Sequence, residues 1–314
     1  MAKIIVITAV ITGLMVLFGS FFPSINAQVV LKAIGSQGSG PGQLNDPRGV
    51  YVDNKGKLYV VDSGNSRIQV FDTNGKLIKT WGSFGTANGQ FNHPLGITLD
   101  YNRGYVYVTD TGNDRVEKFT SNGTFITSWG SSGRGDGQFN TPIGIDEDEA
   151  KQNVYVADIG NNRIERFASN GLFVSGWGSY GSGDGQFYNP GRIAVDPSGN
   201  VFVGDFGNNR IEKFDANGNF LMAWGSFGGG DGQFYNPTGL AVQFPQGNVY
   251  VYGAGNHRIQ EFSNDGKFIN KWILPLGISA PSVRGNDIAV DSAGNIFLTN
   301  ANSSNVNIIS TAPK

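Results

Sequence analysis

The chain lacks cysteine altogether and contains only two histidines among its 314 residues. The absence of cysteine excludes disulfides, thiolate metal sites and cysteine nucleophiles, although it identifies no compartment, because a large apolar core is stable without disulfides. A zinc site with three histidine ligands cannot be assembled from His93 and His257 alone. We therefore expect no cofactor and no metal in the interpretation that we favour.

Charge is scarce as well. Charged residues make up 15 % of the chain, the formal net charge is −2, and no run of lysine or arginine occurs. Proteins that bind nucleic acid usually carry a basic excess or a basic stripe, so nucleic acid is not expected as a partner. The 47 glycines and the 12 % of aromatic residues instead favour many short strands, joined by tight turns, around an aromatic-rich core.

Long apolar runs are missing except at the N-terminus. Lys3 precedes an almost wholly apolar stretch over residues 4–22, and Ala27 ends a small-residue cleavage pattern. The run is close to the roughly 20 residues that span a bilayer. We expect residues 1–27 to be either a cleaved signal peptide or an N-terminal membrane anchor. Residues 28–314 then form one exported domain, extracellular or in the cell envelope.

The remainder of the chain is an internal repeat. Tryptophan recurs at intervals of 48, 48, 47 and 48 residues, an arginine recurs at the same intervals, and a proline recurs at intervals of 47, 48, 48 and 47. The tryptophans are Trp81, Trp129, Trp177, Trp224 and Trp272. A fixed period of this length is typical of solenoids and propellers.

Each repeat predicts four short antiparallel strands, which is the content of one propeller blade. In the first repeat they lie near residues 49–52, 58–62, 67–72 and 77–81. The third and fourth strands are joined by Asn-Gly, as in Asn122-Gly123, which predicts a type I′ turn with positive φ at both residues. Stacked blades cover both faces of each sheet, which explains strands that are apolar on both faces.

The last repeat lacks its fourth strand. Three strands are expected near residues 287–291, 296–300 and 306–309, after which the sequence stops at Lys314. The segment Val30–Ser36 matches Leu77–Ser83, so the N-terminal segment should supply the missing outer strand. Closing the ring in this way removes an exposed sheet edge. The predicted fold is an all-β, six-bladed β-propeller of four-stranded antiparallel blades.

The recurring motifs resemble a known repeat. P-x-G-I-x-x-D, V-Y-V-x-D-x-G-N-x-R-I and F-x-x-N-G-x-F recur in register and are similar to the NHL repeat. WD40 blades end in Trp-Asp, whereas each tryptophan here is followed by glycine or isoleucine. The resemblance covers residues 28–314 and implies an exported, stand-alone NHL-repeat propeller.

An aspartate and an arginine flank the turn between the second and third strands in four repeats. Facing each other across a hairpin, they are close enough for an ion pair. We interpret them as structural, because a catalytic device would not be needed four times. The expected pairs are Asp62 with Arg67, Asp110 with Arg115, Asp158 with Arg163, and Asp205 with Arg210.

Departures from the repeat supply the candidate ligand-binding residues. The innermost strand begins with glycine in four repeats, but with Arg192 and Asp287 in two others. Asp146 replaces a small or uncharged residue two positions further on, and Glu147 follows it; a solvated acidic loop is the alternative interpretation. In the fifth repeat Arg258 follows His257 and has lost its aspartate partner. No catalytic residue is assigned.

The resemblance also frames the function. Some members of the family are peptide-amidating lyases with histidine-held zinc, and others bind RNA through a basic face; neither suits this sequence. We expect a monomeric, non-enzymatic binding or scaffold module that recognises a protein, peptide or glycan, with membrane contact only through an uncleaved N-terminal segment. The alternative is a divalent-ion-dependent hydrolase or lyase with a carboxylate site at the channel mouth. Its candidate residues are Asp146, Glu147 and Asp287, with Arg192 and Arg258 as the cations.

Overall fold

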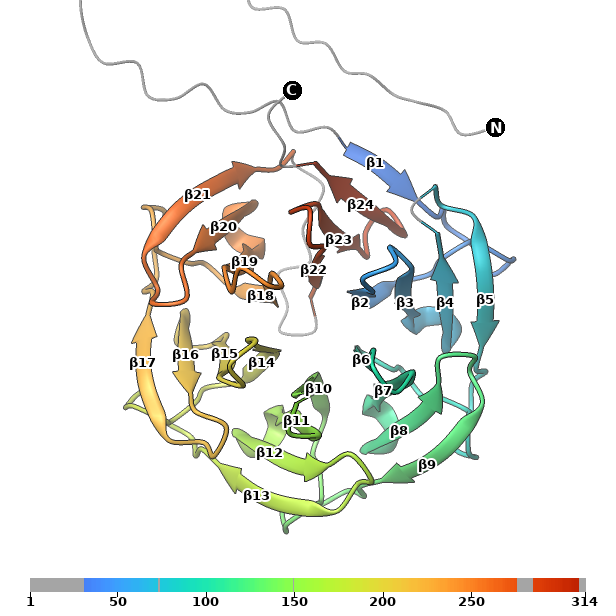
Figure 1. Ribbon diagram of the computed structural model, residues 1–314, viewed down its shortest axis with the longest axis horizontal. Helices are drawn as coiled ribbons and strands as arrows, with labels where there is room; N and C mark the ends of the chain where they lie inside the picture. The colour runs from blue at the N-terminus through green and yellow to red at the C-terminus, as the bar shows by residue number, and fades with distance from the viewer. Residues whose placement is uncertain (1–30, 73, 149, 276–284, 311–314) are drawn as a thin grey trace, which may run out of the picture.

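The computed structural model describes residues 31–310, apart from residues 73, 149 and 276–284. Six four-stranded antiparallel sheets are arranged as blades around a central axis (Figure 1). This arrangement confirms the predicted six-bladed propeller. Residues 1–27, expected to be a signal peptide or anchor, lie outside the described residues. Within the described part of the chain, no helix combines the length and the apolar character needed to cross a bilayer.

The first three blades have closely similar bounds. Blade one contains β2 (Pro47–Val52), β3 (Leu58–Asp62), β4 (Arg67–Phe71) and β5 (Leu77–Trp81). Blade two contains β6 (Gly96–Asp100), β7 (Tyr105–Asp110), β8 (Arg115–Thr120) and β9 (Phe125–Trp129). Blade three contains β10 (Pro142–Asp148), β11 (Asn153–Asp158), β12 (Arg163–Ala168) and β13 (Phe173–Trp177).

The remaining blades complete the ring. Blade four contains β14 (Pro190–Val195), β15 (Val201–Asp205), β16 (Arg210–Phe214) and β17 (Phe220–Trp224). Blade five contains β18 (Pro237–Val242), β19 (Val249–Gly253), β20 (Arg258–Phe262) and β21 (Phe268–Ile273). Blade six contains β22 (Ile288–Val290), β23 (Ile296–Asn300), β24 (Asn305–Ile309) and β1 (Leu31–Ile34). Short 3-10 helices follow the second strand at η1 (Ser63–Asn65), η2 (Thr111–Asn113), η3 (Ile159–Asn161) and η4 (Ala254–Asn256).

The N-terminal strand closes the ring. β1 pairs antiparallel with β24, with Ala33 opposite Asn307 and Ile34 opposite Val306. It forms the outer strand of blade six, on the periphery of the ring (Figure 1). The prediction that the N-terminus supplies the missing strand is therefore confirmed.

The hairpin between the third and fourth strands differs from the expected type I′ turn. In blade two, Gly123 has φ +79°, whereas Asn122 has no positive φ. Gly123 donates to the carbonyl of Thr120 at 2.8 Å, and Thr120 donates to the carbonyl of Thr124 at 2.9 Å. The loop is thus a turn that ends in one left-handed glycine with a bulge. The expectation of positive φ at both residues was wrong, because a longer loop places only the glycine in the left-handed region.

The core lies between blades. All five residues of β3 are buried, because neighbouring blades cover both faces of the sheet. The outer-strand tryptophan of one blade packs on the hairpin glycine of the next: a Cβ at Gly123 would lie 2.7 Å from Cδ2 of Trp81. The Trp81 ring also lies 6.1 Å from that of Phe119 in blade two. The tryptophan period therefore reflects packing between consecutive blades.

Candidate functional site

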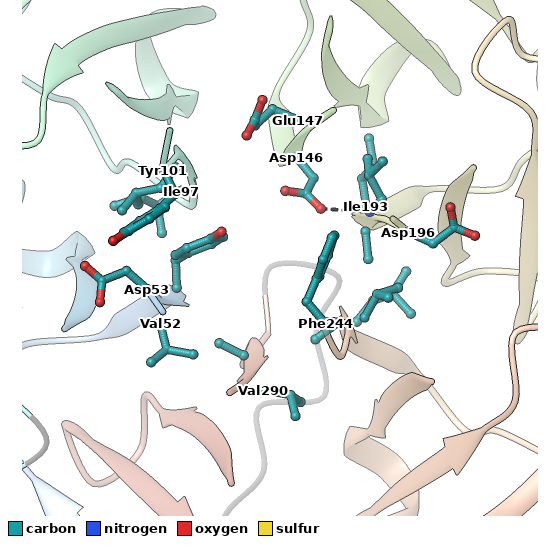
Figure 2. Close-up of a pocket in the computed structure, with 18 of the residues that line it drawn as sticks. Val52, Asp53, Ile97, Tyr101, Asp146, Glu147, Ile193, Asp196, Phe244 and Val290 are labelled. Carbon is teal, nitrogen blue, oxygen red and sulfur yellow. Dashed lines mark hydrogen bonds between the residues drawn. The ribbon is translucent and has the colours of Figure 1, made fainter. Parts of the chain in front are cut away.

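A cavity of about 470 Å³ occupies the central channel. The innermost strands of all six blades line it, and its mouth lies where these strands end and turn into the second strands. Apolar side chains make up much of its wall, including Val52, Ile97, Ile193 and Val290 (Figure 2). The innermost strands bring one free sheet edge each to the channel, so polar groups there need partners from other blades.

Arg192 and Asp287 meet across the floor of the cavity. Arg192 Nη1 of blade four lies 3.4 Å from Asp287 Oδ2 of blade six and donates to the carbonyl of Leu95 of blade two at 3.1 Å. The two residues are only 3 % and 7 % exposed. Burial lowers the pKa of Arg192. Its Nε and Nη2 have no hydrogen-bond partner among the described residues.

Asp146 connects three neighbouring blades in the same channel. Its Oδ1 accepts from the Thr98 hydroxyl at 2.7 Å, and its Oδ2 accepts from the Val195 backbone N–H at 2.8 Å, the contact dashed in Figure 2. Burial raises the pKa of Asp146 to about 6, even though these hydrogen bonds lower it. The carboxylate satisfies polar groups on the innermost strands of blades two and four.

Asp287 lies on the other side of the ring, near backbone N–H groups of three blades. Burial raises its pKa to about 6, while Arg192 and the backbone N–H groups of Ile288, Val50 and Leu240 lower it. These N–H groups come from blades six, one and five. Asp146 and the Arg192–Asp287 pair therefore link the innermost strands of different blades at the floor of the cavity.

Carboxylates surround the mouth of the cavity. Asp53 Oδ1 accepts from the backbone N–H groups of Lys55 and Lys57 at 2.9 and 2.7 Å, which holds the turn into the second strand. Asp196 and Asp291 hold the equivalent turns in blades four and six. Sequence reasoning missed these three residues. The signal that could have found them is an aspartate that ends the innermost strand three residues before a glycine.

Glu147 and two aromatic residues complete the mouth. Glu147 lines the cavity and is 9 % exposed, and it belongs to β10 rather than to a solvated loop. Tyr101 and Phe244 extend over the mouth from blades two and five (Figure 2), and Phe244 is 52 % exposed. The mouth thus combines negative charge with exposed aromatic surface.

His257 and Arg258 are not part of this site. Both follow the end of β19 that points away from the cavity mouth, and neither lines the cavity. Arg258 is 4 % exposed and donates from Nη1 to the Gly229 carbonyl and from Nη2 to the Gln233 carbonyl, both at 2.7 Å. His257 is the left-handed residue of the turn, with φ +50°. Of the six candidate residues, the structure brings Asp146, Glu147, Arg192 and Asp287 to one cavity and leaves these two outside it.

The repeated aspartates and arginines form ion pairs on the face opposite the mouth. Arg67 Nε lies 2.6 Å from Asp62 Oδ2, and Arg67 also donates to the carbonyls of Ser39, Gly40 and Gln43. The corresponding distances are 2.7 Å for Asp110 with Arg115, 2.9 Å for Asp158 with Arg163, and 3.0 Å for Asp205 with Arg210. Each pair fastens the loop that enters its blade. Arg258 makes the same carbonyl contacts without the aspartate.

Metal-binding geometry is absent from the residues that the structure describes. No group of three or more histidine, cysteine, aspartate or glutamate side chains is placed to hold an ion among them. The carboxylates of the mouth are instead used by the turns, and those of the floor by strand edges. The described carboxylates give the cavity a negatively charged lining.

Comparison with protein families finds matches to two repeat models. The NHL repeat matches residues 44–71, 91–119 and 187–214, and a β-propeller repeat matches residues 271–300. Human NHL repeat-containing protein 3 is 39 % identical over 62 residues, which are 19 % of this chain and 18 % of that protein. RING finger protein nhl-1 of Caenorhabditis elegans is 38 % identical over 63 residues, which are 20 % of this chain and 6 % of that protein. The matches thus cover less than a fifth of these relatives.

Solved structures resemble the whole ring. Virginiamycin B lyase from Staphylococcus aureus superposes with a TM-score of 0.61 at 12 % identity, over 91 % of this chain and all of that chain. A chain of a nidogen/laminin complex superposes with a TM-score of 0.57 at 17 % identity, over 78 % of this chain and 93 % of that chain. At such identities the likeness shows a common fold alone, since propellers serve unrelated functions.

Proposed function

Since the chain is an NHL-repeat β-propeller, we propose that it is a non-enzymatic binding module of the extracellular space or cell envelope, whose channel mouth receives a cationic side chain of a protein or peptide partner. The observation that carries the proposal is the charge of the cavity. Among the residues that the structure describes, seven carboxylate residues line it against one arginine. They are Asp53, Asp146, Glu147, Asp148, Asp196, Asp287 and Asp291. The apolar run at residues 4–22 supports export.

A lysine or arginine side chain matches the recess in shape and in charge. Its hydrocarbon stem can lie along the aliphatic wall while its cationic end stays near water and the carboxylates. The half-buried ring of Tyr101 and the exposed ring of Phe244 add cation–π attraction at the mouth. The floor repels a cation at Arg192, so the charge of the partner stays at the rim.

The alternative of a hydrolase or lyase has one observation in its favour. The pKa values of Asp146 and Asp287 are both raised to about 6 in one cavity, and perturbed carboxyls cluster at catalytic sites. Against it, both oxygens of Asp146 already accept hydrogen bonds. Elemental analysis of the purified protein tests the divalent-ion form of this alternative, because a stoichiometric ion would support it.

Neutralising the rim tests the binding proposal. The variant Asp53→Asn/Glu147→Gln/Asp196→Asn/Asp291→Asn keeps an acceptor oxygen for each turn while removing four charges. Fluorescently labelled peptides that contain lysine or arginine should bind the wild type and lose affinity by about tenfold in the variant, a loss of about 1.4 kcal/mol spread over four charges. Added salt should weaken the wild-type complex, because ions screen the attraction between the cation of the peptide and the carboxylates at the open mouth. Fluorescence anisotropy measures both effects.

Two controls make the result decisive. Asp184→Asn removes an exposed carboxylate from the opposite face and should leave peptide affinity unchanged. The same peptides with glutamine in place of the cationic residue should not bind. Equal binding by the neutral peptides, or by the rim variant, contradicts the proposal. Recovery of the protein from the host cytoplasm with residues 1–27 intact contradicts export.

A further inference from the structure

Four large aromatic side chains are exposed on the face opposite the cavity mouth. Tyr180 is 68 % and Tyr188 45 % exposed, in the loop from β13 to β14. Phe227 is 66 % and Tyr235 46 % exposed, in the loop from β17 to β18. We call these four residues the aromatic surface. The two loops enter blades four and five, so the surface spans consecutive repeats.

The repeat itself does not require these aromatic residues. Each such loop contains an isolated β-bridge, whose first residue is Tyr180 or Phe227 here. The equivalent residue is Phe84 in blade two, but Gln37 and Ser132 in blades one and three. Tyr188 and Tyr235 occupy positions that other blades fill with asparagine. Those asparagines are Asn45, Asn92 and Asn140. Aromatic residues at both positions of a loop are therefore an addition to the scaffold, made only in these two loops among the described residues.

The rings are held in place before any ligand arrives. Tyr180 and Tyr188 pack edge to face with centroids 5.5 Å apart, and Phe227 and Tyr235 do so at 5.3 Å. Tyr188 also lies against Gly207 of the neighbouring turn so closely that a Cβ there would clash with its ring. Gly255 supports Tyr235 in the same way. Fixed rings lose little conformational freedom on binding, which favours affinity.

Apart from the exposed carboxylate of Asp184, the charged groups around the aromatic surface are paired. The neighbouring guanidinium groups are already in use, since Arg210 donates to the Ser182, Gly183 and Gln186 carbonyls. Arg258 likewise donates to the Gly229 carbonyl in the loop that enters blade five, and Asp231 forms an ion pair with Lys271. What remains is ring surface with phenolic hydroxyls, which suits a ligand that has both apolar faces and hydroxyl groups.

From these observations we propose that the aromatic surface binds a neutral glycan chain. The faces of sugar rings carry C–H groups that pack on aromatic rings, while sugar hydroxyls exchange hydrogen bonds with tyrosine. An edge-to-face aromatic pair occurs at equivalent positions of two consecutive loops, Tyr180 with Tyr188 and Phe227 with Tyr235, and a ligand made of repeated units can use both pairs. Linking two such contacts in one ligand raises the overall affinity beyond that of either alone. This site is separate from the cavity and goes beyond the proposed function.

Replacing the rings by the residues of other repeats tests the proposal. Tyr188→Asn/Tyr235→Asn introduces the asparagine of blades one to three, and Tyr180→Ser/Phe227→Ser introduces the serine of Ser132. Both variants should fold, because the repeat already accommodates these residues. The test is native affinity electrophoresis in gels that contain β-glucan, soluble chitin oligomers, mannan or xylan. At least one of these glycans should slow the migration of the wild-type protein. Each double variant should bind the retarding polysaccharide at least about tenfold more weakly.

Phe84→Ser is the matched control. Phe84 is 71 % exposed in the equivalent loop of blade two, where Asn92 stands in place of the second ring. Loss of the Phe84 ring should leave the migration of the protein in the glycan gel unchanged. The melting temperatures of all variants should agree with one another. The proposal is overturned if none of the four polysaccharides retards the wild type, or if Phe84→Ser weakens binding as much as the double variants. A protein partner captured through these rings without any polysaccharide binding would overturn it too.

Discussion

Three buried glutamates occupy one position of the repeat in blades two, three and four. They are Glu117, Glu165 and Glu212, and burial raises the pKa of each to about 7. Blades one and five have Gln69 and Gln260 at the same position. Gln69 accepts from the Gly42 N–H at 2.9 Å and donates to the Gln43 carbonyl at 2.6 Å. A charged glutamate can accept the first of these bonds but cannot donate the second.

The triple variant Glu117→Gln/Glu165→Gln/Glu212→Gln should therefore be more stable than the wild type in mild alkali. Because the folded pKa values are raised, the glutamates favour folding fully below about pH 4 and lose that contribution as the pH rises through about 7. Replacing the three glutamates should flatten the pH dependence of the free energy of unfolding. It should also raise that free energy by about 1 kcal/mol per site at about pH 8, which is the net contribution of one hydrogen bond. Urea unfolding at about pH 5 and about pH 8 measures both.

The reverse substitution is the control for this prediction. Gln69→Glu places the same buried carboxyl in blade one and should make stability fall more steeply with rising pH. Asp146 and Asp287 also have raised pKa values and remain in the triple variant, so some pH dependence persists. A triple variant with the wild-type slope would show that these glutamates do not titrate in the folded protein.

At the scale of the element, β1 is the strand on which ring closure depends. It covers the edge of β24, and Ile34, only 2 % exposed, packs with Val306 and Phe297. Ile34 also contacts the hairpin of blade one, since a Cβ at Gly75 would lie 3.3 Å from its Cγ1. Ile34 thus performs in blade six the packing that tryptophan performs between other blades.

Deleting residues 28–36 should lower the melting temperature and promote aggregation, because it exposes both an unpaired strand edge and part of the core. Differential scanning calorimetry and light scattering measure these effects. As a control, Ile34→Val keeps the strand and should cost only about 0.5–1.5 kcal/mol. A soluble deletion protein with an unchanged melting temperature would show that the ring does not need β1.

Across the whole molecule, three charged residues join the innermost strands of all six blades. Arg192 connects blades four, two and six, Asp146 connects blades three, two and four, and Asp287 connects blades six, one and five. Each is tied to partners that are distant in sequence, so they act only when the ring is closed. They stabilise the assembled propeller rather than a single blade.

Arg192→Met should consequently destabilise the protein more at high pH than at low pH. Without the arginine, the pKa of Asp287 rises further, so its unfavourable charge appears as the pH increases through that pKa. Breaking a buried pair costs about 3–5 kcal/mol when the remaining partner is charged, which applies at about pH 8 but not at about pH 5. The double variant Arg192→Met/Asp287→Asn should recover much of this loss. Equal destabilisation at both pH values in urea unfolding would refute the ion-pair interpretation.

The sequence by itself determined the architecture. The period of the tryptophans defined the repeat, its strand pattern defined the blade, and the match between Val30–Ser36 and Leu77–Ser83 identified the closing strand. The pairing of Asp62 with Arg67 was also accessible, because the two residues flank one short turn. These features depend on local spacing, and local spacing is legible in a sequence that repeats it.

Only the tertiary structure decided which departures from the repeat meet. Arg192 and Asp287 are about two repeats apart in sequence yet in contact across the axis, whereas Arg258, which looked equally unusual, binds its own loop on the opposite face. The rim aspartates each look like an ordinary turn residue, such as Asp53, until the ring gathers them at one mouth. The physical reason is that a repeat encodes the neighbours of each blade, while distances across the axis and the end of the blade that each side chain occupies exist only once the ring has closed.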